Sequence, residues 1–114
     1  PEDFLRDFVD YWNITGTWDS MPEERKKMWM NLQPKILSEA RMLCYDKTPV
    51  SFYESIQHPI LITLSKETPP HQYEVCKIVA SYLKNVKLVN VSGGHMGVIT
   101  KSKEVVPYLL DWIT

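Results

Sequence analysis

The chain begins with apolar residues that recur every three to four positions, the spacing of one face of an α-helix. These residues are Phe4, Leu5, Phe8, Val9 and Trp12. The pattern predicts a helix over residues 1–13. Gly16 is expected to end this segment, because glycine readily adopts the left-handed backbone that closes helices.

A second helical pattern follows, with apolar residues at a spacing of four: Met28, Leu32, Ile36 and Ala40. Ser20 is predicted to cap this helix, and Glu23 is placed to reach back to the same turn. Pro34 lies inside the pattern and lacks an N–H group, so we expect either a kink or two shorter helices. Residues 50–57 then form a short amphipathic helix or a packed loop.

The second part of the chain has a different pattern. Runs rich in β-branched and apolar residues predict strands over 60–64 and 86–91. Between them, Thr68 is expected to cap a helix whose apolar stripe is Val75, Ile78, Val79 and Tyr82. A last helix carries Val105, Val106, Leu109, Leu110 and Ile113. Strand, helix and strand with short connections form a βαβ unit, in which the two strands are parallel.

The fold class is therefore α/β, with two parallel strands flanked by helices and preceded by a helical segment. We place the boundary between these parts at residue 58, because residues 1–58 carry a net charge of −3 and residues 59–114 carry +2. Two short parallel strands do not make a stable sheet alone, and such sheets are normally covered on both faces. We expect residues outside this sequence, another chain or a swapped copy to complete the sheet.

The loop over residues 92–97 is the strongest candidate for chemistry. It follows the second strand and places His95 between glycines, which allow a sharp turn that exposes the imidazole. Ligands bind at the carboxyl ends of parallel strands, and histidine is suited to acid–base work near neutral pH. We predict that His95 is a general base; the alternative is that it only fills the loop. Glu67, in the loop after the first strand, is the candidate acid that orients it, with helix capping as the alternative.

The pieces from Pro59 to Trp112 resemble the C-terminal end of an α/β-hydrolase-fold enzyme. Residues 59–64 are similar to its penultimate strand, residues 86–91 to its last strand, and residues 92–97 to the loop that bears the triad histidine. The aromatic and Met-rich residues 1–58, residues 11–18 above all, resemble the helical lid of that family. The resemblance implies a serine hydrolase that acts on a small ester-like substrate with an apolar part, by hydrolysis of an ester or a related acyl or C–C bond.

Two departures from the family's pattern bear on this function. Many members have the triad acid just before a proline after the penultimate strand, where this chain has Thr68 before Pro69. Glu67 would have to substitute, or the acid lies outside this chain or is absent. The chain also contains no Gly-x-Ser-x-Gly, so the nucleophile and oxyanion hole are missing, and we expect no hydrolysis by the chain alone. The second hypothesis is a non-catalytic split domain that binds itself or a partner through its open strand edge.

Four side chains are candidates for lining a substrate pocket: Trp12, Trp18, Met21 and Met96. The alternative for the three residues in the helical segment is ordinary packing between helices. We predict no cofactor, because no motif calls for one. No metal site is expected either, because the histidines and the cysteines Cys44 and Cys76 lack zinc-ligand spacing.

The composition narrows the classes of partner. Hydrophobic residues make up 44% and charged residues 24%, and the formal net charge of −1 provides no basic surface for nucleic acid. No apolar run reaches the roughly 18 residues that a membrane span needs. Two cysteines are too few for a disulfide scaffold, so we expect a cytoplasmic protein. The first residue is Pro1 and no signal peptide follows it, which indicates a processed chain or a fragment of a longer one.

Overall fold

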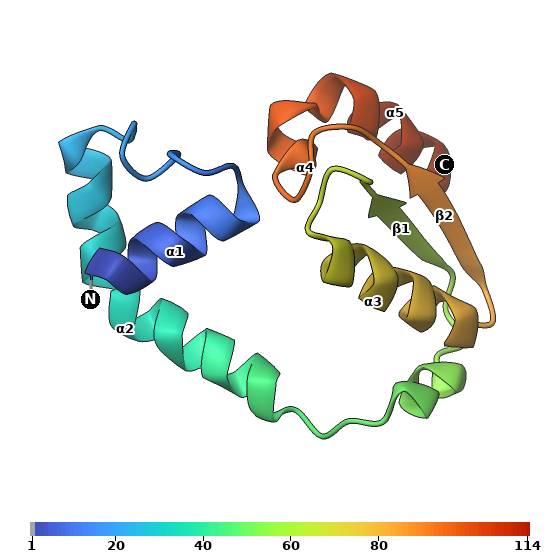
Figure 1. Ribbon diagram of the computed structural model, residues 1–114. Coiled ribbons are helices and arrows are strands. Elements are labelled where there is room, and N and C mark those ends of the chain that lie inside the picture. The colour runs from blue at the N-terminus through green and yellow to red at the C-terminus, as the bar shows by residue number, and fades with distance from the viewer. Residues whose placement is uncertain (1) are drawn as a thin grey trace. The chain divides into compact units, whose positions relative to one another are not determined.

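The computed structural model describes residues 2–114 and separates into two compact units, one ending at Thr48 and one beginning at Pro49 (Figure 1). The first unit contains α1 (Glu2–Trp12) and α2 (Glu23–Tyr45). The second contains the 3-10 helix η1 (Val50–Ser55), β1 (Ile60–Leu64), α3 (Pro70–Tyr82), β2 (Val86–Asn90), α4 (Gly97–Thr100) and α5 (Ser102–Ile113). The division falls before η1 rather than at residue 58, because η1 contacts α3.

The core of the first unit forms where α1 meets the loop that follows it. Leu5, Val9 and Trp18 are almost fully buried there. Partly buried apolar side chains pack around these three: Phe4, Phe8, Met21, Trp29 and Ile36. The apolar face predicted for α1 is therefore confirmed, and Gly16 ends the segment with a left-handed φ of 91°.

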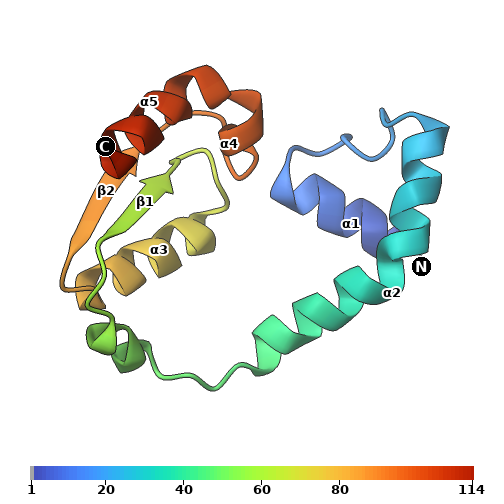
Figure 2. The ribbon, with the colours of Figure 1, turned by 180° about the vertical axis from the view of Figure 1, so that it is seen from behind.

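Helix α2 starts later than the capping pattern predicts. The residue before its first turn is Pro22, and the Ser20 hydroxyl donates instead to the Thr17 carbonyl at 3.0 Å. The prediction that Ser20 caps the helix is wrong, because the loop uses this serine for its own turn. Pro34 lies within the helix, which continues to Tyr45 and changes direction along its length (Figures 1 and 2). A proline inside a helix lacks the N–H that would bond the preceding turn, which accounts for a change of direction within α2.

The second unit is built on the predicted parallel strand pair. Ile60 lies opposite Val86 and Leu64 opposite Asn90, and the Val91 N–H extends the ladder to the Leu64 carbonyl at 2.9 Å. Helix α3 lies on one side of the strands and α5 on the other (Figures 1 and 2). The α/β class and the parallel direction of the strands are confirmed.

The start of α3 differs from the prediction. Pro69 precedes the first turn, with Pro70 as the first helical residue and no side chain capping the helix. Thr68, predicted as the cap, is 7% exposed, and its N–H donates to the Ser65 carbonyl at 3.2 Å. Thr68 therefore belongs to the turn that follows β1 rather than to the helix.

The helices of the second unit cover few of their apolar side chains. Its buried apolar residues are Leu64, Leu83 and Val105. On α3, Val75 and Ile78 are each half exposed. On α5, the exposed apolar residues are Val106, Tyr108, Leu109, Leu110 and Ile113. Most of the apolar stripe predicted for the last helix thus lies at the surface of this unit.

Candidate active site

The loops that follow β1 and β2 meet at one edge of the strand pair, as the parallel topology predicts. The Ser65 hydroxyl accepts the Gly94 N–H at 3.1 Å, and Oε1 of Glu67 accepts the Gly93 N–H at 3.2 Å. Both acceptors come from the first loop and both donors from the second. Side chains of the loop after β1 therefore bind the backbone of the loop after β2.

Glycines determine the path of the second loop. Gly93 and Gly94 have φ angles of 93° and 63°, a left-handed conformation that other residues rarely adopt. Gly97 is required for a different reason: a Cβ atom there would lie 2.5 Å from the Ser92 carbonyl oxygen. The loop therefore folds back tightly on itself around residue 95.

A carboxylate from α5 binds the start of this loop. Oε1 of Glu104 accepts the Ser92 N–H at 3.0 Å, and Oε2 accepts the Ser92 hydroxyl in a short hydrogen bond. The hydroxyl, then the N–H of Ser92, hold the pKa of Glu104 below its usual value of 4.5, and the Lys101 ammonium acts in the same direction. Glu104 is thus an ionised side chain bound twice by one residue of the loop.

His95 lies at the outer end of this arrangement. Its side chain is exposed, and the neighbouring Met96 is 37% exposed. Glu67 is also exposed, and its carboxylate holds the loop backbone two residues before His95. The structure therefore brings the predicted base and the predicted acid to one edge, with Met96 beside them in the chain.

The substrate-lining candidates in the first unit occupy different surroundings. Trp18 is 0% exposed, and the structure places it in the unit's core with Met21 packed at the margin. Trp12 is half buried and packs edge-on against Phe8 and Tyr11, with ring centroids 6.4 and 5.1 Å away. These contacts are packing between apolar side chains, the alternative that the sequence left open.

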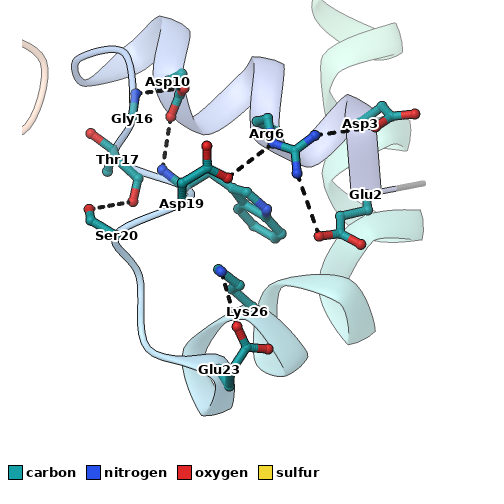
Figure 3. A network of polar contacts seen from close by, with 11 residues as sticks. Glu2, Asp3, Arg6, Asp10, Gly16, Thr17, Asp19, Ser20, Glu23 and Lys26 are labelled. Carbon is teal, nitrogen blue, oxygen red and sulfur yellow. Dashed lines mark hydrogen bonds and ion pairs between the residues drawn. The ribbon is translucent and has the colours of Figure 1, made fainter.

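A second polar cluster organises the first unit (Figure 3). The two carboxylate oxygens of Asp10 accept the Gly16 and Trp18 N–H groups, each at 2.8 Å. These amides, that of Trp18 first, hold the pKa of Asp10 below its usual value of 3.8. Arg6 forms an ion pair with Asp19 of the same loop at 3.3 Å. The cluster closes the loop over α1, and both carboxylate oxygens of Asp10 are already used by backbone N–H groups.

One shallow hollow of about 250 Å³ lies beside the first strand exit, lined by Lys66, Pro70, Tyr73 and Glu74. Its residues flank Glu67 in the chain, and His95 does not line it. Both cysteines are free, Cys44 exposed and Cys76 half buried. Within residues 2–114, no cluster of three or more His, Cys, Asp or Glu side chains has a geometry suited to a metal ion.

The residues that sequence reasoning missed are those that hold the loop rather than carry the chemistry. Ser65 is the first residue after β1, a position that in parallel sheets faces the ligand edge, and this was the available signal. Glu104 lies twelve residues after Ser92, and nothing in that spacing indicates a contact. Only the fold, which turns α5 back beside the loop, brings them together.

None of the helices in the described part of the chain combines the length and hydropathy that crossing a bilayer requires. Comparisons with known protein families, with curated proteins and with solved structures give no match.

Proposed function

We propose that the chain is the lid and C-terminal catalytic segment of an α/β-hydrolase-like serine hydrolase. The observation that supports this most is the position of His95, which is exposed between two glycines at the carboxyl edge of a parallel strand pair. The adjacent loop supplies Glu67 to the same edge. In this class of enzyme a carboxylate that is hydrogen-bonded to the histidine orients the imidazole, which in turn activates the serine.

In the complete enzyme, His95 takes the proton from a serine hydroxyl as the oxygen attacks the ester carbonyl. The histidine then returns the proton to the leaving alcohol. The serine and the oxyanion-hole donors come from a companion segment, since these 114 residues contain no nucleophile elbow. The substrate class is a small ester with an apolar part, with Met96 beside the base and the first unit as the lid.

A fluorophosphonate probe tests this proposal without knowledge of the substrate, because it reacts with a serine that a general base has activated. The protein is isolated from its native cells through an affinity tag on the native gene product, so that a companion segment or polypeptide is retained. We expect one labelled serine, and we expect His95→Ala to slow labelling roughly 10²- to 10⁴-fold, the usual contribution of a general base. His58→Ala, which alters an exposed histidine before β1, is the control and should label at the normal rate. Material without a labelled serine, or labelling that survives His95→Ala, contradicts the proposal.

A second candidate function is self-association without catalysis. In the described residues β1 has a strand on one side only, and its five residues carry no charge to discourage further pairing. Helices α3 and α5, which lie on either side of these strands (Figure 1), both carry exposed apolar residues. Light scattering and probe labelling together separate the two functions. Self-association requires an assembly larger than a monomer that Ile62→Lys dissociates. It also requires that the probe labels no serine.

A further inference from the structure

The loop before His95 is held by side chains at three consecutive backbone N–H groups. The donors are the N–H groups of Ser92, Gly93 and Gly94, and the acceptors are Glu104, Glu67 and Ser65 in that order. The acceptors come from α5 and from the loop after β1, so two separate elements hold one short stretch of backbone. These three hydrogen bonds fix the direction in which the backbone enters the next residue, His95.

Glu104 makes the densest of these contacts. Its carboxylate binds both the N–H and the hydroxyl of Ser92, whereas Glu67 and Ser65 each accept one N–H from the loop. The backbone of Glu104 is itself fixed, because the next residue, Val105, is 1% exposed in the unit's core. The Glu104 carboxylate therefore links the loop to a helix that is anchored in the core.

We infer that Glu104 is a positioning residue for His95, acting on the imidazole through Ser92 and the glycines that follow. This inference rests on the proposed function, since it assigns a role within that same site. Two glycines in succession leave a loop free to adopt many conformations, and a catalytic group displaced by about 1 Å can lose 100-fold in rate. Binding of Ser92 by Glu104 restricts that freedom three residues before His95.

The side chain of Glu104 is exposed, so its removal leaves the apolar core intact and a role in the loop separable from a role in the fold. Helix α5 also supplies a matched control. Asp111 lies on the same helix and forms an ion pair with Lys87 of β2 at 2.9 Å, away from the loop. Asp111→Ala therefore removes a paired carboxylate from α5 without touching Ser92.

The first measurement is amide hydrogen exchange by NMR in the 114-residue chain. We expect Glu104→Ala to speed exchange of the Gly93 and Gly94 amides at least about 10-fold relative to the amides of β1 and β2. Glu104→Gln keeps an oxygen acceptor for the Ser92 N–H and should restore near-normal exchange, and Asp111→Ala should leave the loop unchanged. Ser92→Ala, which removes only the hydroxyl, serves as a second variant and should give a smaller effect of the same sign.

The second measurement is the rate of fluorophosphonate labelling in the natively isolated protein. We expect Glu104→Ala to slow labelling roughly 10- to 100-fold, and Glu104→Gln to recover most of the rate. Unchanged loop exchange in Glu104→Ala, or equal acceleration of loop and strand amides, overturns the inference. Labelling that is normal in Glu104→Ala also overturns it and leaves the proposed function standing. If Glu104→Ala speeds exchange of the loop amides alone and the probe labels no serine, the result supports the role of Glu104 in holding the loop and overturns the hydrolytic function.

Discussion

The hydroxyl of Ser65 accepts the backbone N–H of Gly94 at 3.1 Å, although 29 residues separate the two in the chain. The same oxygen accepts the Glu67 N–H, also at 3.1 Å. Ser65 is only 4% exposed, so water has little access to replace these contacts. One buried hydroxyl thus shapes the first loop and joins it to the second.

Removal of that hydroxyl should destabilise the second unit. Ser65→Ala leaves two N–H groups without their acceptor, and we expect a loss of roughly 1–3 kcal/mol in the free energy of unfolding. Urea denaturation followed by far-UV circular dichroism measures this loss. Ser81→Ala, which removes an exposed hydroxyl bonded within α3, is the control and should cost less than about 0.5 kcal/mol. Equal effects of the two substitutions would show that the Ser65 contact contributes little.

Gly97→Ala should destabilise the loop by direct collision. The new Cβ would lie 2.5 Å from the Ser92 carbonyl oxygen, and relief of such overpacking typically costs about 1–3 kcal/mol. Gly16 offers a contrast, because a Cβ there meets no atom within 4 Å and only the φ of 91° opposes a side chain. Asn tolerates left-handed backbone, so Gly16→Asn should recover most of the stability lost in Gly16→Ala, whereas Gly97→Asn should be no better than Gly97→Ala. Thermal unfolding of the four variants checks this pattern.

The stability contributed by Asp10 should depend on pH. Its pKa lies below the usual value because the Trp18 and Gly16 amides bind the ionised form, which the unfolded chain does not do. The contribution is therefore complete above the ordinary pKa of 3.8 and is lost as pH falls through the lowered native pKa. We expect Asp10→Asn to lower the urea midpoint by a constant amount between roughly pH 5 and 7, and the difference to shrink below about pH 4. Asp7→Asn, on the same helix, is the control; a pH-independent gap for Asp10→Asn would contradict the assignment.

Leu5 should be among the most sensitive apolar residues of the first unit. It is 0% exposed in the cluster with Val9 and Trp18, and Leu→Ala changes at such sites cost about 2–5 kcal/mol. Ile14→Ala, at a side chain that is 76% exposed, should change stability by less than about 0.5 kcal/mol. Chemical denaturation of both variants compares them, and a cost below 1 kcal/mol for Leu5→Ala would show that this cluster is not the core.

Elements with a strong period were predictable from sequence, and helix starts were not. The uncharged run Ile60–Leu64 and the apolar spacing of Leu5 and Val9 are local patterns that predict a partly buried strand and a buried helix face. Ser20 and Thr68 carry the side chains that commonly cap helices, yet both lie in turns of the preceding loops. A capping side chain competes with local turn contacts, and the sequence alone does not show which of them is satisfied.

The candidate site divides in the same way. The position of His95 between glycines after a strand is visible in the sequence, and the parallel topology implies that Glu67 lies at the same edge. The contacts of Ser65 and Glu104 depend on where two distant elements meet in space, which no spacing along the chain expresses. For α5, the periodicity of the sequence predicts an apolar face but does not show whether another element covers it.

The uncovered apolar residues of α5 affect how this protein should be studied in solution. Environment-sensitive dyes such as anilinonaphthalene sulfonate fluoresce on exposed apolar patches and are commonly taken to report misfolding. Here Leu109, Leu110 and Ile113 present such a patch on the native chain, so a high dye signal at room temperature is expected of properly folded material. Among the four tryptophans only Trp18 is fully buried, so the change in intrinsic emission that its exposure causes reports unfolding of the first unit.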